Sequence, residues 1–392
     1  MSYTVLARRY RSKSFDEVVG QEQIARTLQN AITHGRVAHA YLFCGTRGVG
    51  KTSTARVFAK ALNAPGDQPK DVADAIMLGR DTDVIEIDAA SNNGVEQARE
   101  LIANSIYRPL RGRYKIYIID EVHMLSTAAF NALLKTMEEP PDHVVFILCT
   151  TETHKVPATI QSRCQRFDFR NIPTARIIEH LGAVVKHEGL IATPELLHMV
   201  ARLGNGSMRD ALSLMDRLMA SGEKQLTLPL LQDLLGLPDR ELVSQLVRTI
   251  AGGEVAGALK ATGNLLGRGI SPEQLLGTLA DHFRDLMVIC SCGKETDLVE
   301  LSGELRQQAV EEASHFDAAG LVYMISLCEN VSRTMRSSSS SRALLDAAIV
   351  RLAMAEKFAD VTAVAMGAAT SPAANGARAV VTRTGSSAAK KA

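Results

Sequence analysis

The sequence of 392 residues has no run of eighteen uninterrupted apolar residues, and its basic first segment, Met1 to Arg11, has no apolar stretch. We therefore expect neither a membrane span nor a secretory signal. Positive charge is not in excess either, because 44 lysines and arginines stand against 43 aspartates and glutamates. A net charge of +1 excludes a general binder of polyanions. Contact with nucleic acid would have to come from a local patch or from an assembled ring.

Cysteine is sparse, with six residues scattered mostly within apolar runs at positions 44, 149, 164, 290, 292 and 328. This pattern predicts buried, reduced thiols, as in a cytoplasmic protein. Cys290 and Cys292 are the only close pair, without a second pair nearby. We therefore expect no metal site at these two residues.

A glycine-rich segment gives the strongest functional signal. Residues Gly45 to Thr52 fit G-x-x-x-x-G-K-[ST], follow an apolar strand candidate and open a helical pattern from Thr52 to Leu62. This is the context that a phosphate-binding loop needs, because its backbone N–H groups and the helix N-terminus attract phosphate oxygens. Lys51 is expected to reach the β- and γ-phosphates of ATP, and the Thr52 hydroxyl to bind Mg²⁺. The predicted nucleotide-binding residues are Gly45, Thr46, Arg47, Gly48, Val49, Gly50, Lys51, Thr52 and Ser53.

A second segment, Ile116 to Glu121, has the pattern of a buried strand that ends in two carboxylates. Asp120 is expected to hold the metal ion through water, and Glu121 to orient and deprotonate an attacking water. An Asp-Glu pair at a strand end is often structural when it stands alone. Behind a phosphate loop it indicates ATP hydrolysis.

The first 170 residues alternate between strand and helix patterns. Continuous apolar strands separated by amphipathic helices predict a parallel sheet that is covered on both faces. One helix is expected to begin at the Ser126 N-cap and to run through Met137. The strands are expected at 40–44, 84–87, 115–119, 144–148 and 166–169.

Beyond the sheet the pattern is helical, with three short helices expected between Pro173 and Ala220. A polar break at 221–224 leads to a further helical region with turns near 236–238, 252–253 and 269–272. The last stretch is rich in Ala, Ser, Thr and Gly and lacks sustained apolar periodicity, which predicts a disordered tail. The expected division is an ATP-binding domain at 1–170, a small helical domain at 171–222, an all-helical domain at 226–358 and the tail at 360–392.

Several short segments are informative when taken together, namely 85–92, 117–126, 130–136, 138–141 and 162–167. In these segments the chain resembles the gamma/tau subunits of the bacterial DNA polymerase III clamp loader, a family of AAA+ ATPases. The resemblance covers residues 4–220 densely, and 226–358 in pattern and position. It implies an α/β AAA+ module with a parallel sheet, a small helical lid and an all-α collar domain through which the subunits assemble.

The resemblance also implies roles for single residues. Thr151 corresponds to the polar sensor-1 residue, and Arg209 to the sensor-2 arginine of the lid. Arg163 corresponds to the arginine finger, which completes the site of the neighbouring subunit and so links hydrolysis to correct assembly. Without the resemblance, each arginine would be interpreted as a solvated surface charge. The expected adenine pocket comprises Tyr10, Val19 and Gly20.

The chain departs from the family pattern in three places. Members usually carry four zinc-binding cysteines before the second strand, but residues 63–74 contain neither cysteine nor histidine, so no zinc is expected. The family's Tyr-Arg-Pro is Tyr10-Arg11-Ser12 here, which loses some turn rigidity. The sequence also ends soon after the collar region, which is typical of the gamma length rather than the longer tau length.

Contact with DNA is the least specific expectation. Arg99 follows Asn92-Asn93-Gly94 on a predicted helix, where it is either a phosphate contact inside a spiral of subunits or a solvated surface charge. Arg111 and Arg113 lie in a loop with proline and glycine, and for these two the surface interpretation is favoured.

The sequence therefore predicts a cytoplasmic, ATP- and Mg²⁺-dependent clamp loader subunit of the DNA polymerase III holoenzyme, without a polymerase site of its own. Its expected partners are the other loader subunits, the sliding clamp, primer–template DNA and the polymerase, with no membrane. One alternative is a mainly structural loader subunit with little turnover, against which the intact Lys51, Thr52, Asp120 and Glu121 argue. Another is a different AAA+ DNA motor, such as a branch-migration helicase.

Overall fold

The computed structural model describes residues 4–64, 70–236, 238, 240–296, 298, 299, 301, 303–338 and 340–355. The chain divides into two compact units, with the boundary between Leu234 and Leu235. The predicted lid lies in the first unit with the predicted ATP-binding domain, so the finer division into three domains stays a prediction. The predicted tail, 360–392, lies outside the described residues. No helix in the described part is both long and apolar enough to cross a membrane.

A five-stranded parallel sheet forms the centre of the first unit, with the strand order β2-β3-β4-β1-β5. The five predicted strands are confirmed. Three of them, β2, β3 and β4, extend further than expected, to Asp88, Asp120 and Thr150, and β5 begins and ends one residue earlier than expected. Asp88 pairs with Asp120, and Cys44 pairs with Thr150, so polar residues gather at the carboxyl edge of the sheet. In open sheets of this kind, ligands bind at this edge. The strands are β1 Ala40–Cys44, β2 Val84–Asp88, β3 Lys115–Asp120, β4 Val144–Thr150 and β5 Gln165–Asp168.

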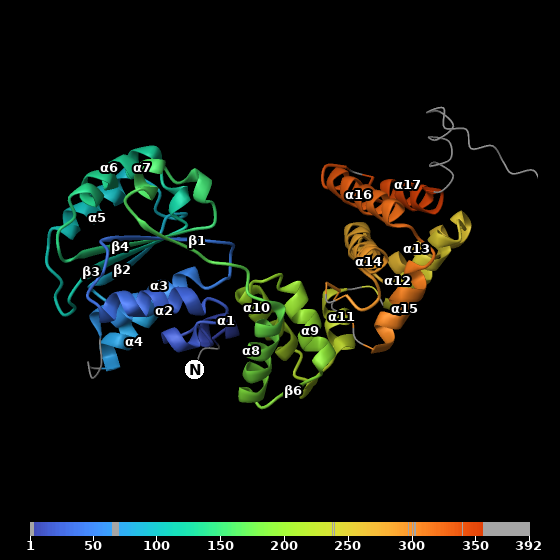
Figure 1. Ribbon diagram of the computed structural model, residues 1–392, viewed down its shortest axis with the longest axis horizontal. Coiled ribbons are helices and arrows are strands. Elements are labelled where there is room, and N and C mark those ends of the chain that lie inside the picture. Colours follow the sequence, from blue (N-terminus) through green and yellow to red (C-terminus); the bar gives the residue numbers. More distant parts are fainter. Residues whose placement is uncertain are drawn as a thin grey trace, which may run out of the picture. The chain divides into compact units, whose positions relative to one another are not determined.

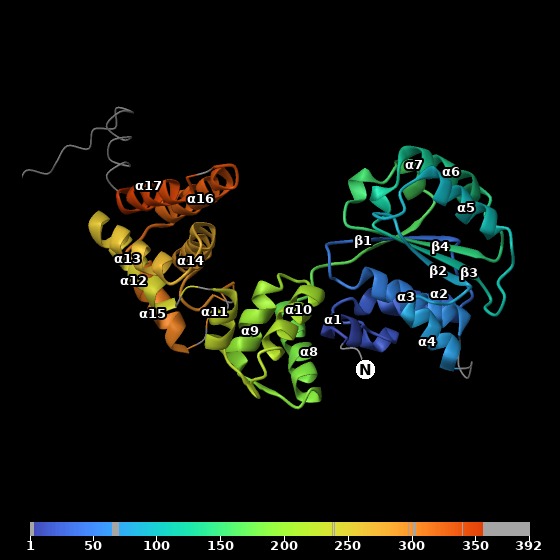
Figure 2. The ribbon, with the colours of Figure 1, turned by 180° about the vertical axis from the view of Figure 1, so that it is seen from behind.

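Helices cover both faces of the sheet, as predicted (Figure 1). Alternate residues of β1 face opposite sides, so Tyr41 and Phe43 pack in one core with Phe58, while Leu42 packs in the other core with Phe130. The reverse view in Figure 2 shows the same two layers. The first core includes α2 Glu22–Thr33, α3 Lys51–Asn63 and α4 Lys70–Leu78, and the second includes α5 Val95–Ser105, α6 Thr127–Glu138 and α7 Ala158–Gln161.

The start of α6 confirms the predicted N-cap. The Ser126 side chain accepts a hydrogen bond from the backbone N–H of Ala129, which satisfies one of the free donors of the first turn. Three short 3₁₀ helices complete this part of the fold: η1 Phe15–Glu17, η2 Val122–Met124 and η3 Thr153–Lys155.

The lid region contains the three predicted helices, but it is not all helical. Two short strands pair in parallel, with Ala192 opposite Leu226, and Leu226 is fully buried. Strands of two residues are too short to show an alternating pattern, so they could not be predicted from the sequence. The first helix of the chain is tied to the lid, because the backbone N–H of Leu6 donates to Asp216. These elements are α1 Leu6–Arg9, α8 Thr174–His187, β6 Ile191–Ala192, α9 Pro194–Leu203, α10 Met208–Met219 and β7 Gln225–Leu226.

The second unit is helical and has its own core, and α11 spans the boundary between the units. The predicted turns are confirmed by Gly236, Gly253 and Gly269, all of which have positive φ angles that favour glycine. The long central helix begins with a capping box between Ser271 and Gln274. The helices are α11 Leu228–Leu235, α12 Arg240–Ala251, α13 Val255–Gly267, α14 Pro272–Cys292, α15 Gly303–Ala313, α16 Ala318–Met335 and α17 Ser341–Ala353.

The six cysteines all carry free thiols, and the prediction that they are buried is confirmed for Cys44, Cys149 and Cys328, whereas Cys164 is half-buried. Cys290 and Cys292 are exposed. They occupy the last turn of α14, outside the face on which Leu286 and Ile289 enter the core. The described residues contain no group of three or more cysteine, histidine or acidic side chains arranged to hold a metal ion.

Candidate nucleotide-binding site

The glycine-rich loop lies between the end of β1 and the start of α3. Gly45, Gly48 and Gly50 have φ angles of 152°, 77° and 101°, a region that residues with a side chain seldom adopt. A Cβ atom at Gly45 would lie 2.5 Å from the backbone oxygen of Phe169, and one at Gly48 would lie 1.9 Å from Ser207 Oγ. The first and second glycines are therefore required both by the backbone angles and by close neighbours.

Lys51 lies inside this loop. Its ammonium group donates to the backbone oxygens of Gly45 and Thr46, each at 2.8 Å, and only 6% of the residue is exposed. Burial lowers the pKa of Lys51. A buried ammonium group surrounded by loop backbone is suited to bind an anion that enters the loop.

Thr52 and Asp120 meet across the space between α3 and β3. The Thr52 hydroxyl donates to Asp120 Oδ2 at 2.8 Å, and burial raises the pKa of Asp120. Hydroxyl and carboxylate oxygens are the ligand types that Mg²⁺ prefers. The two residues therefore fit the metal-binding role that the sequence predicts for them.

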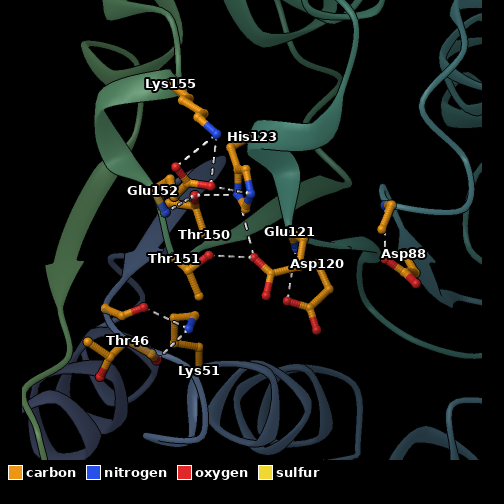
Figure 3. A network of polar contacts seen from close by, with 12 residues as sticks. Thr46, Lys51, Asp88, Asp120, Glu121, His123, Thr150, Thr151, Glu152 and Lys155 are labelled. Carbon is orange, nitrogen blue, oxygen red and sulfur yellow. Dashed lines mark hydrogen bonds and ion pairs between the residues drawn. The ribbon is translucent and has the colours of Figure 1, made fainter. Parts of the chain in front are cut away.

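Glu121 follows Asp120 in a left-handed conformation, with φ of 47°, which is uncommon for a residue with a side chain. The Thr151 hydroxyl donates to Glu121 Oε2 at 3.0 Å. In Figure 3 the side chains of Thr151 and Glu121 point toward each other, and Lys51 and Asp120 are drawn next to this pair. The predicted water-activating acid and the predicted sensor-1 residue are thus in direct contact.

A cavity of about 380 Å³ brings most of the predicted residues together. Tyr10 and Val19 line it as expected of an adenine pocket, whereas Gly20 is not among its lining residues in the described part of the chain. A Cβ atom at Gly20 would lie 2.9 Å from Ile172, which does line the cavity. The other predicted residues that line it are Arg47, Gly48, Val49, Gly50, Lys51, Thr52, Ser53, Asp120, Glu121 and Arg209.

The three predicted arginines have different surroundings. Arg209 lines the cavity from α10, and its backbone N–H lies 3.5 Å from the Gly48 oxygen. Arg163 instead pairs with Glu138 and donates to the Thr159 backbone oxygen at 2.6 Å, outside the cavity lining. Arg99 pairs with Glu96 on α5, and both side chains are largely exposed. The roles predicted for these arginines stay predictions.

Sequence reasoning missed several polar groups at the site. Arg11 and His180 line the cavity, and burial lowers the pKa of both. His180 lies on α8, and its Nε2 is buried without a hydrogen-bond partner among the described residues. His123 lies between Glu121 and Glu152. His123 lies in the segment 117–126 that carries the family resemblance, and Arg11 follows Tyr10 in the Tyr-Arg pair, but the sequence indicated no separate role for either residue. His180 carried no motif signal.

Comparison with protein families gives three consecutive matches. Residues 20–173 match the family described as DNA polymerase III, delta subunit. Residues 176–224 match the ATPase lid domain of the DNA polymerase III clamp loader subunit. Residues 226–365 match domain III of the DNA polymerase III subunits gamma and tau.

Similar proteins agree with these matches. The chain is 40% identical to DNA polymerase III subunit tau of Bacillus subtilis over 363 residues, which cover 90% of this chain and 63% of that protein. It therefore spans less than two thirds of the length of that relative. Among solved structures, the RuvB branch-migration motor of Thermotoga maritima has a TM-score of 0.45 and 19% identity, covering 62% of this chain and 79% of that one. This likeness is too weak to indicate function.

A shorter relative is matched over a larger share of its length. The chain is 42% identical to DNA polymerase III subunit gamma of Buchnera aphidicola over 247 residues, which cover 62% of this chain and 68% of that protein. The match to the lid domain ends at residue 224, and the match to the gamma and tau domain begins at residue 226. The family assignment therefore rests on sequence similarity and not on the fold alone. The chain belongs to the gamma/tau family of DNA polymerase III clamp loader subunits.

Proposed function

We propose that this chain hydrolyses ATP, and that hydrolysis drives the loading of a sliding clamp onto primed DNA for the DNA polymerase III holoenzyme. The observation that carries the proposal is the meeting of Lys51, Thr52, Asp120 and Glu121 around one cavity at the carboxyl edge of the sheet. A subunit that had lost turnover would not need all four groups. Membership of the clamp loader family supplies the biological setting.

The residues present fit ATP with Mg²⁺. The left-handed glycines leave room for phosphate oxygens to approach the loop backbone, and the buried Lys51 ammonium supplies positive charge. Thr52 and Asp120 would hold Mg²⁺, directly or through water. When bound, the metal neutralises charge on the β- and γ-phosphates. Tyr10 and Val19 would contact the base.

The remaining steps belong to the side chains around the γ-phosphate. Glu121 accepts a proton from the attacking water and orients it, while Thr151 holds the Glu121 carboxylate. Arg209 stabilises charge on the phosphates from the lid side of the cavity. Arg163 acts on the site of the neighbouring subunit, in keeping with its position outside its own cavity.

Assembly involves the other parts of the chain. The helical region at 226–358 serves as the collar that joins the loader subunits, and the lid at 171–222 closes over the nucleotide. Arg99 contacts primer–template DNA through phosphate, for which its exposed position on α5 is suitable. The protein acts in the cytoplasm and binds no zinc.

Separate measurement of ATP binding and ATP turnover tests the proposal. Lys51→Ala should lose both, because the phosphates lose their cation. Glu121→Gln should bind ATP normally and lose turnover by at least about a hundredfold, the scale expected for a missing general base. Lys60→Ala is the matched control, because Lys60 lies on the same helix and donates to the Lys13 backbone outside the site. Normal turnover in Glu121→Gln would refute the assigned chemistry.

A further inference from the structure

His123 lies between Glu121, which follows strand β3, and Glu152, which follows strand β4. Its Nδ1 lies 3.1 Å from the Thr150 hydroxyl and 3.5 Å from Glu121 Oε2. Its Nε2 lies 3.3 Å from Glu152 Oε1. Figure 3 shows the imidazole between the Glu152 side chain and the Glu121 carboxylate. The ring therefore joins the turn after β3 to the turn after β4.

This histidine is packed more firmly than the groups that it joins. Its side chain is 6% exposed, against 33% for Glu121 and 37% for Glu152. Glu152 is also held from outside, because Lys155 donates to it at 3.0 Å and this hydrogen bond lowers the pKa of the Glu152 carboxyl. The backbone N–H of Glu152 donates to the Thr150 hydroxyl at 3.0 Å. This hydrogen bond holds the Thr150 hydroxyl in place beside His123 Nδ1.

We propose that His123 is a positioning residue for Glu121: held by Glu152 and Thr150, it sets the direction in which the Glu121 carboxylate faces the attacking water. This inference rests on the proposed ATP hydrolysis. Thr151 contacts the same carboxylate oxygen, Oε2, so the two contacts together restrict rotation of a partly exposed side chain. A general base must be held close to the proton that it removes, and a displacement of about 1 Å can cost two orders of magnitude in rate.

The two ring nitrogens contact different residues, and substitution with asparagine or glutamine can test the contacts of each nitrogen separately. His123→Asn places an amide nitrogen near the position of Nδ1, beside Thr150 and Glu121, but cannot reach Glu152. His123→Gln extends toward the position of Nε2 and restores only the Glu152 contact. His123→Ala removes both. His154→Ala is the matched control, because His154 also faces Glu152, at 3.7 Å, but its side chain is 76% exposed and has no contact with Glu121 among the described residues.

The experiment measures kcat, KM and the ATP dissociation constant of these variants in the full chain. We expect His123→Ala and His123→Gln to lower kcat about tenfold, the scale of a lost supporting hydrogen bond, while ATP affinity changes less than about twofold. His123→Asn should recover part of the loss, and His154→Ala should match the wild type. Normal ATP affinity also shows that each variant is folded at the site.

Two results would overturn the inference. One is an unchanged kcat in His123→Gln or His123→Ala, and the other is an equal loss in the Asn and Gln variants, which would indicate packing rather than positioning. Glu121→Gln separates this outcome from failure of the proposed function. If Glu121→Gln loses turnover while His123→Gln keeps it, only the role of His123 is wrong; if Glu121→Gln keeps turnover, the hydrolysis chemistry itself is wrong.

Discussion

Gly48 lies where the phosphate loop contacts the lid helix α10, so we expect Gly48→Ala to change the conformation of both. Its φ angle is 77°, and an added Cβ would lie 1.9 Å from Ser207 Oγ and 3.1 Å from Arg209 Cβ. Ser207 is the N-cap of α10, where its side chain accepts from the backbone N–H of Asp210 at 3.2 Å. Gly48→Ala therefore forces either the loop or the capping serine to move.

The size of the effect can be worked out from these contacts. A left-handed conformation costs an alanine about 1–2 kcal/mol. Rotation of Ser207 away from the clash removes the N-cap, which costs about 1 kcal/mol more. Gly189→Ala is the matched control, because Gly189 also has a positive φ, 72°, and no heavy atom of the described residues would lie within 4 Å of its Cβ. The control should therefore show the backbone cost alone.

Hydrogen exchange in α10 is the suitable assay, because the chain has two compact units and a whole-chain melt would mix their transitions. Gly48→Ala should reduce the free energy of opening of α10 by about 1 kcal/mol more than Gly189→Ala does. It should also weaken ATP binding, whereas Gly189→Ala should not. Equal exchange in the two variants, together with wild-type ATP affinity in Gly48→Ala, would refute the contact between loop and lid.

Three further outcomes are expected. Arg163→Ala should bind ATP nearly normally yet lose turnover by at least about tenfold, and mixing it with Lys51→Ala subunits should restore some hydrolysis at interfaces that pair an intact loop with an intact finger; no recovery in verified mixed oligomers would point to a role in its own site. Purified protein should contain no stoichiometric zinc by elemental analysis, because residues 63–83 contain no cysteine or histidine; one tightly bound equivalent would contradict this. In the second unit, burial alone would raise the pKa of Glu312, but hydrogen bonds from His282 and Ser244 outweigh it and lower the pKa below the usual 4.5. The ionised Glu312 carboxylate therefore stabilises the folded state above pH 4.5, and this stabilisation is lost as the pH falls through the lowered pKa of Glu312 in the folded state. Glu312→Gln should lower the free energy of opening of α15, measured by hydrogen exchange at neutral pH, by about 3 kcal/mol, whereas the exposed neighbour change Glu311→Gln should lower it by nearly nothing; equal values would contradict the buried pair.

The sheet and the phosphate loop were predictable because their signals are local. The central strands β1, β3 and β4 are short apolar runs bounded by polar residues, and the loop motif lies between β1 and a helix. The Ser126 cap is likewise a local contact, over three residues. These features need no knowledge of the rest of the fold.

Contacts between distant segments could not be predicted in this way. His123 meets Glu152 only because parallel pairing places the ends of β3 and β4 side by side. Tyr10 lines the cavity as predicted, yet its hydroxyl also contacts Glu188 of the lid, a residue 178 positions away. Such contacts depend on the packing of several elements at once, and no single segment carries a pattern for them.

The most direct test of the proposed function is ATP turnover by the chain assembled with its partner subunits, measured with and without sliding clamp and primer–template DNA. We expect that clamp and DNA together raise kcat, and that Glu121→Gln in this chain removes the increase. Turnover that is absent under all conditions, or that does not respond to clamp and DNA, would contradict an ATP-driven clamp loader subunit.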